Sequence, residues 1–224
     1  MVIKKLLIKW LSEQCSAQDT IQIIQKKVER LPPEDALRYL LVLDNQLYSL
    51  LGQASVRYGN GIHSEHRHIN YHDFFIRHIN PNETVLDLGC GNGACAYDIV
   101  TSVSNCRVIG IDINKEAIDY ANTHYKHDGL SFIYGDILRD IPAMNNPVIV
   151  LSNVLEHLSD RIQFLSKTQG ELNPDRFLIR VPIYERDWRV PLKEELGIEY
   201  RLDLTHEIEY KKGELEAELQ KAGL

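Results

Sequence analysis

Residues 85–93 read Val85-Leu-Asp-Leu-Gly-Cys-Gly-Asn-Gly93, an apolar run containing one acid that leads into three glycines at alternate positions. Gly89, Gly91 and Gly93 let the backbone approach a ligand closely because they carry no Cβ. Asp87 places a carboxylate beside that approach. A strand followed by such a loop is typical of nucleotide binding at the carboxyl end of a parallel sheet. The stretch therefore predicts both a fold class and a kind of ligand.

The residues that follow alternate between β-rich apolar runs and helical patterns. Five runs are expected to be strands, namely 84–88, 107–113, 130–134, 147–152 and 176–181. Helices are expected over 93–104, 115–127, 154–169 and 214–222. Parallel strands need helical crossovers, so this alternation predicts an α/β, doubly wound, mostly parallel Rossmann-like sheet with helices on both faces.

The segment before residue 59 has a different pattern. Ile21, Ile24 and Val28 recur at helical spacing, and Pro32-Pro33 marks the start of a new helix. We expect residues 1–58 to form a helical N-terminal extension and residues 59–224 to form the Rossmann-like domain. Within that domain, residues 183–210 lose the alternation and are expected to be an insertion over the active site.

Composition narrows the class of protein. The 224 residues are 44% hydrophobic, which is enough for a sizeable core. A net charge of −7 argues against broad nucleic-acid binding. The four cysteines show no CxxC spacing, so a reducing, cytoplasmic location is expected. No run approaches the ~18 apolar residues of a membrane span, and residues 1–11 are read as a docked helix, with membrane-surface contact as the alternative.

Acidic residues stand at the ends of the next two predicted strands. Asp112 ends the second strand, where a carboxylate can accept hydrogen bonds from both hydroxyls of a ribose. Asp136 follows the third strand and can accept a hydrogen bond from the exocyclic amine of adenine. Ile113 and Ile137, each next to one of these acids, are expected to sandwich the adenine ring.

The fourth predicted strand leads into Asn153-Val-Leu-Glu-His-Leu158, which would place Asn153 and His157 beside the reacting group. His157 is the candidate general base, because an unperturbed imidazole titrates near neutrality. The alternative is that His157 has a structural or cofactor-facing role.

Four segments together resemble the motifs of class I S-adenosylmethionine-dependent methyltransferases. They are Val85–Gly93, Ile109–Ile113, Tyr134–Ile137 and Ser152–Leu158. Over roughly residues 70–222 the chain resembles in particular the small-molecule branch that includes the ubiquinone-biosynthesis O-methyltransferases. The resemblance implies S-adenosyl-L-methionine as cofactor and a sheet of order 3-2-1-4-5. The family's terminal strands six and seven have no counterpart in this sequence.

The resemblance also implies roles for single residues. It places the methionine part of the cofactor against Asp87, Gly89, Cys90, Gly91, Asn92 and Gly93. Asp112 would bind the ribose, Asp136 the adenine amine, and Asn153 would lie near the sulfonium. In related enzymes the helix before the first strand lies over the cofactor, so Tyr71 or Arg67 could touch the methionine carboxylate or the substrate.

The acceptor pocket is expected from residues 59–75 and 183–210, with His63, Arg67, Tyr184 and Trp188 as candidate contacts. His63, His66, His68 and His72 do not share one helical face, so a lid or solvated segment is expected there, and no metal. No Asn/Asp-Pro-Pro-Tyr sequence follows the fourth strand, which disfavours base amines and glutamine amides as acceptors. Oxygen, nitrogen, carbon and sulfur acceptors all remain open, and an oxygen or nitrogen of a small-molecule or saccharide-type acceptor is expected because these are the commonest acceptor atoms.

Two other functions remain open at this point. Gly89-Cys-Gly-Asn-Gly-Ala94 also fits a dinucleotide fingerprint, which would suit an NAD-dependent oxidoreductase. A non-catalytic module that binds S-adenosylmethionine or acts as a scaffold is the second. Without strands six and seven, an uncovered edge strand would be open to pairing in a homodimer.

Overall fold

The computed structural model describes residues 2–59 and 63–224, without the side chains of residues 2–4, 6–8, 66 and 67. The chain divides into two compact units. We call Met1–Ala54 with Leu192–Tyr200 the helical unit, and Ser55–Pro191 with Arg201–Leu224 the sheet domain.

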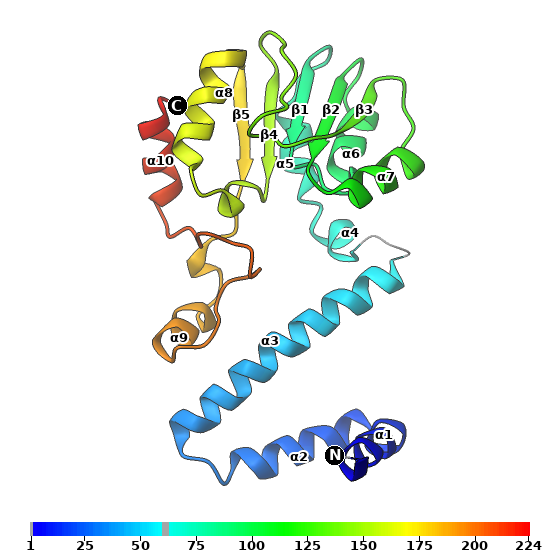
Figure 1. Ribbon diagram of the computed structural model, residues 1–224, viewed down its shortest axis with the longest axis vertical. Helices are drawn as coiled ribbons and strands as arrows, with labels where there is room; N and C mark the ends of the chain where they lie inside the picture. The colour runs from blue at the N-terminus through cyan, green and yellow to red at the C-terminus, as the bar shows by residue number, and fades with distance from the viewer. Residues whose placement is uncertain (1, 60–62) are drawn as a thin grey trace. The chain divides into compact units, whose positions relative to one another are not determined.

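The sheet domain is built on five parallel strands (Figure 1). They are β1 (Thr84–Leu88), β2 (Arg107–Asp112), β3 (Leu130–Tyr134), β4 (Val148–Ser152) and β5 (Arg176–Arg180). Their spatial order is β3-β2-β1-β4-β5, which confirms the predicted doubly wound sheet and its order. The central strand is β1, on which Asp87 lies opposite Gly110 of β2 and Val150 of β4.

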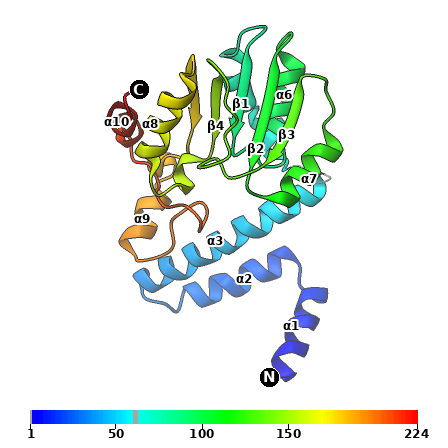
Figure 2. The same ribbon diagram turned by 45° about the horizontal axis from the view of Figure 1, so that its top comes forward.

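Helices cover both faces of this sheet (Figure 2). They are α5 (His72–Arg77), α6 (Ala94–Ser102) and α7 (Lys115–His124), then α8 (Arg161–Leu172) and α10 (Glu214–Ala222). Alternate residues of β1 belong to two separate cores: Val85 packs with Phe75 of α5 and the apolar side of α6, whereas Leu86 packs with Leu165 of α8 and with α10. This burial on both faces explains why the strands read as continuous apolar runs.

Short elements complete the domain: α4 (Glu65–Ile69), the 3₁₀ turns η1 (Leu155–His157) and η2 (Tyr184–Arg186), and the start of α9 (Arg189–Glu195). The helix predicted over 154–169 is wrong in its first turns, because η1 occupies that region and α8 begins at Arg161. The backbone N–H groups of Glu207 and Ile208 donate to the Glu156 carbonyl, at 2.7 and 3.3 Å. That carbonyl is therefore engaged by a distant segment rather than by the next helical turn.

The helical unit contains α1 (Val2–Gln14), α2 (Ala17–Val28) and most of α3 (Pro33–Tyr58). Ser16 and Asp19 form a capping box that starts α2. Residues 192–200 pack against α3 in this unit, where Lys193 Nζ lies 2.9 Å from Asp44 Oδ2 and 2.7 Å from Asn45 Oδ1. Nowhere in the described chain is a helix both long and apolar enough to cross a membrane.

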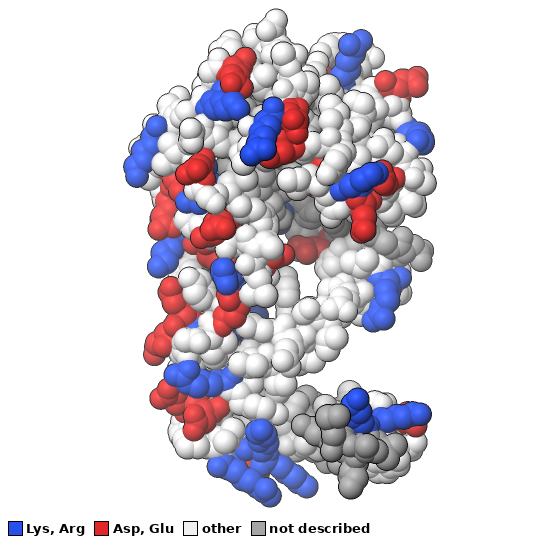
Figure 3. All heavy atoms as spheres, in the orientation of Figure 1, with Lys and Arg blue, Asp and Glu red and all other residues white. Residues whose placement is uncertain are grey.

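Acidic and basic side chains are interspersed on the face of the sheet domain that Figure 3 shows. Among the described residues on that face, charges of the two signs alternate rather than gather into a continuous positive surface. Nucleic-acid binding generally uses a basic face. This mixed surface agrees with the net charge of −7.

Candidate cofactor and acceptor site

The loop after β1 depends on glycine at three positions. Gly89, Gly91 and Gly93 have φ angles of 77°, 54° and 82°, in the left-handed region. A Cβ on Gly89 would lie 2.6 Å from the Val154 side chain, and one on Gly93 would lie 2.5 Å from Phe132. A Cβ on Gly91 would meet no atom within 4 Å. The first and third glycines thus allow close packing, while the second borders open space.

The Asp87 carboxylate is buried and has no partner among the described residues. Its exposed fraction is 1%, and neither carboxylate oxygen has a hydrogen-bond partner among the residues that the structure describes. Burial, together with the nearby Asp112 carboxylate, raises the pKa of Asp87 to about 7. Because an unpaired buried charge is costly, the site fits a ligand that brings a cationic or hydrogen-donating group.

Asp112 is fixed beside the glycine loop at the end of β2. Its Oδ2 accepts from the backbone N–H of Gly91 at 2.8 Å, and its Oδ1 accepts from that of Asn114 at 2.7 Å. Each oxygen keeps a further lone pair, which suits recognition of ribose hydroxyls. The loop itself is tied to β2, because the N–H groups of Gly89 and Cys90 both donate to the Ile111 carbonyl.

The residues predicted to surround adenine stand at the ends of neighbouring strands. Ile113, directly after β2, is 67% exposed, although it is apolar. Asp136 follows β3, and its Oδ1 accepts from the backbone N–H of Leu138 at 2.9 Å. Ile137 is half-buried and packs against the core that contains Leu165. Asn92, within the glycine loop, accepts from the Ala94 N–H at 3.3 Å.

Arg180 brings two predicted site residues together. It is the last residue of β5, and its guanidinium lies 4.1 Å from the centre of the Tyr71 ring. The same group donates to Asn153 Oδ1 at 3.2 Å, while the Arg180 carbonyl accepts from the Asn153 N–H at 2.8 Å. Burial raises the pKa of Tyr71 to about 12. Sequence reasoning missed Arg180, although its position at a strand end was a usable signal.

A pocket of about 490 Å³ lies beside the edge strand β5. Its lining includes Tyr71, Phe74, Arg77 and Arg180. Aromatic and guanidinium groups together suit a planar or anionic acceptor.

The predicted acceptor contacts are dispersed. Tyr184 is buried, with Lys211 Nζ 4.7 Å from the centre of its ring, and Trp188 is 71% exposed. His63 is half-buried, and its Nδ1 accepts from the Glu65 N–H at 3.2 Å. The backbone of Arg67 belongs to α4, but its side chain lies outside the described residues.

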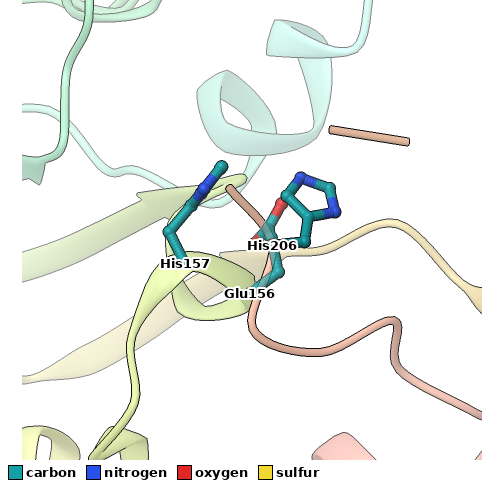
Figure 4. Close-up of side chains that lie close together, drawn as sticks. All are labelled: Glu156, His157 and His206. Carbon is teal, nitrogen blue, oxygen red and sulfur yellow. The ribbon is translucent and has the colours of Figure 1, made fainter. Parts of the chain in front are cut away.

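His157 lies in η1 as part of a group of three polar side chains (Figure 4). Its Nδ1 is 2.9 Å from Thr205 Oγ, and its ring packs edge-on against His206 with centroids 4.6 Å apart. Partial burial and the adjacent His206 lower the pKa of His157. Glu156 completes the group. Sequence reasoning did not select Glu156 or His206, and no local pattern connects two segments so far apart in the chain.

A parallel sheet of this order, with a glycine loop after β1 and a carboxylate after β2, defines a Rossmann-like methyltransferase fold. Residues 79–219 match the family model described as "Methyltransferase domain". The chain belongs to this family of S-adenosylmethionine-dependent methyltransferases. The match favours S-adenosylmethionine over the dinucleotide that the glycine pattern alone had left open.

The chain is also similar to individual curated proteins. Carboxy-S-adenosyl-L-methionine synthase of Shewanella sp. (strain ANA-3) is 32% identical over 115 residues, which are 48% of this chain and 47% of that protein. The chain thus spans about half the length of the curated relatives it matches.

Solved structures show the same fold. The complex of the Haloferax volcanii Trm112 methyltransferase activator with the putative methyltransferase gives a TM-score of 0.59 at 22% identity, covering 77% of this chain and 73% of that one. The small RNA methyltransferase HEN1 gives 0.58 at 18% identity, covering 69% of this chain and 21% of that one.

Proposed function

We propose that the sheet domain transfers the methyl group of S-adenosylmethionine to an oxygen or nitrogen of a small-molecule or saccharide-type acceptor. The observation that carries this proposal is the buried, unpartnered carboxylate of Asp87 next to a glycine loop that borders open space. Methionine supplies an ammonium group for such a carboxylate, and the glycines leave room for the rest of the ligand.

The other cofactor contacts follow the strand ends. The remaining lone pairs of Asp112 would accept hydrogen bonds from the ribose hydroxyls. Asp136 would accept a hydrogen bond from the adenine amine, and the exposed Ile113 would cover one face of the adenine ring. Asn153, held by Arg180, would lie near the sulfonium. The bound cofactor supplies an electrophilic methyl carbon on a positively charged sulfur.

The chain's own residues then mainly position the reactants. Alignment of an acceptor atom behind the methyl carbon is the largest contribution a protein can make to such a displacement. The pocket beside Tyr71 and Arg180 supports the acceptor site. His157, in the turn after β4, is the candidate general base, and its lowered pKa favours the neutral imidazole that can accept a proton.

The net charge of −7 and the interspersed charges on the face that Figure 3 shows support a small acceptor over a nucleic acid, although HEN1 is named a small RNA methyltransferase. The predicted cytoplasmic location accompanies this proposal, on the basis of the cysteine pattern. The name of the Shewanella relatives supports a second candidate, in which the chain modifies S-adenosylmethionine itself. A non-catalytic binding module is the third.

Calorimetry with S-adenosylhomocysteine and with NAD tests the cofactor assignment. The wild-type chain should bind S-adenosylhomocysteine, and Asp112→Ala should weaken binding by roughly 1–3 kcal/mol through loss of charge-assisted hydrogen bonds. The exposed Asp128→Ala is the matched control. Tight NAD binding in place of S-adenosylhomocysteine would contradict the assignment.

Mass spectrometry after incubation with S-adenosylmethionine and an acceptor library separates the three candidates. A methylated acceptor together with S-adenosylhomocysteine supports the proposal. A carboxylated form of the cofactor supports the second candidate, and binding without any product supports the third.

A further inference from the structure

Glu156, His157 and His206 form a compact group of potential ligands on the sheet domain (Figure 4). The first two belong to η1 after β4, and His206 belongs to the loop before α10. One ligand atom from each residue lies within 4.8 Å of the other two. Glu156 is 0% exposed, and within the described residues neither of its carboxylate oxygens has a hydrogen-bond partner. A buried carboxylate in this state requires a positive charge or a donor.

The hydrogen bonds around His157 fix which of its nitrogens carries the proton. Thr205 Oγ donates to Asp203 Oδ1 at 2.7 Å, so its hydroxyl hydrogen is already engaged. The same oxygen lies 2.9 Å from His157 Nδ1 and therefore accepts the Nδ1–H. His157 Nε2 is left with a free lone pair.

The same reasoning applies to His206. Its Nδ1 lies 2.9 Å from Glu209 Oε1, and an ionised carboxylate can only accept, so His206 donates through Nδ1. Glu209 is held in turn by the Leu202 N–H at 2.6 Å and by the Arg186 guanidinium at 2.5 Å. A carboxylate that holds one ring nitrogen while the other faces a metal is the usual arrangement around metal-binding histidines.

We propose that Glu156, His157 and His206 bind a divalent metal ion through one carboxylate oxygen and two imidazole Nε2 atoms. Nitrogen ligands favour zinc or another first-row transition ion over magnesium and calcium, which prefer all-oxygen sites. Three protein ligands leave coordination positions for water or substrate, as in catalytic rather than structural sites. Glu156 is fully buried, and a bound metal ion would supply the positive charge that its carboxylate requires.

The role of the metal rests on the proposed methyl transfer. The group follows β4 at the carboxyl edge of the sheet, the same edge as the glycine loop. A coordinated acceptor hydroxyl would lose its proton to solvent more readily, and the resulting oxygen would form the new bond to the methyl carbon as the carbon–sulfur bond breaks. In this arrangement His157 is a metal ligand, and this role replaces the general-base role proposed for it above.

Metal binding is tested on the full chain, stripped with a chelator and titrated with Zn²⁺ or Co²⁺ alone. Wild type should bind one equivalent, and the Co²⁺ form should show visible absorption from nitrogen and oxygen ligation. Glu156→Gln and His206→Gln should each weaken binding at least ~10-fold, and Thr205→Val should weaken it by roughly the same factor through loss of orientation of His157. His124→Gln is the matched control, because His124 lies on α7 and its ring bonds to the Tyr120 carbonyl.

Circular dichroism and S-adenosylhomocysteine binding confirm that each variant is folded. Wild-type affinity for Zn²⁺ in both Glu156→Gln and His206→Gln would overturn the site, and so would a preference for Mg²⁺ over Co²⁺. Because the readout is metal binding alone, metal binding without cofactor binding would refute the proposed function and leave this inference intact. Cofactor binding without metal binding would refute this inference and leave the proposed function intact.

Discussion

Replacing Asp87 by asparagine separates the two consequences of a buried, unpartnered carboxylate. The side chain is 1% exposed, and the described residues offer neither oxygen a hydrogen bond. Asparagine has nearly the same shape but no charge. We therefore expect Asp87→Asn to stabilise the ligand-free protein at high pH while weakening its binding of the cofactor.

The sign and size of the expected stability difference follow from the pKa of Asp87. The folded-state pKa of Asp87 is raised from 3.8 to about 7, so its contribution to stability is fully present below about pH 4 and is lost as the pH rises through about 7. A rise of this size corresponds to roughly 4 kcal/mol, which relaxation of the site would reduce to about 2–4 kcal/mol. At about pH 8 the variant should exceed wild type by that amount, and at about pH 4.5 the difference should fall to about 1 kcal/mol or less.

Urea denaturation followed by circular dichroism at both pH values measures the stability difference. Calorimetry with S-adenosylhomocysteine at about pH 8 measures the binding loss, expected to be roughly 1–3 kcal/mol because the ammonium loses a charged acceptor. Asp128→Asn, at an exposed position, should change neither quantity. The reasoning is refuted if Asp87→Asn is less stable than wild type at about pH 8, or if it binds S-adenosylhomocysteine as tightly.

Three further substitutions test the loop and the acceptor pocket. Gly91→Ala should weaken S-adenosylhomocysteine binding in calorimetry, because its Cβ enters open space beside the loop, with a strain cost of about 1–2 kcal/mol at φ 54°. Gly93→Ala should instead destabilise the fold itself, by roughly 1–3 kcal/mol in urea denaturation, because the new Cβ lies 2.5 Å from Phe132. Arg180→Met should raise the acceptor KM in steady-state kinetics by more than it changes S-adenosylhomocysteine affinity, since it removes the contacts to Tyr71 and Asn153. An unchanged acceptor KM would separate Arg180 from the acceptor site.

The elements predicted best are those whose signal is local. Thr84–Leu88 forms β1 with the bounds that its apolar run predicts, because burial on both faces selects such a run. The helix predicted over 154–169 is wrong in its first turns, where the backbone N–H groups of residues 207 and 208 bond to the Glu156 carbonyl. Residues 207 and 208 are remote in sequence from residue 156, so the periodicity of residues 154–169 cannot indicate this contact.

In the candidate site, too, the features with a local sequence signal could be predicted and those that depend on remote contacts could not. The positions of Asp87 and Asp112 follow from strand ends and a parallel sheet, so their proximity could be expected. The meeting of Glu156 and His206 depends on the path of the loop before α10, which no spacing rule encodes. The protonation of His157 Nδ1 depends further on the hydrogen bonds of Thr205 to His157 and Asp203, which form only in the folded protein.

A crystal structure of the full chain with bound S-adenosylhomocysteine tests the central claim most directly. The account predicts the methionine ammonium within hydrogen-bond distance of the Asp87 carboxylate, the chain passing Gly91, and the ribose hydroxyls on Asp112. A ligand bound elsewhere, or one that leaves the Asp87 carboxylate without a partner, would contradict it.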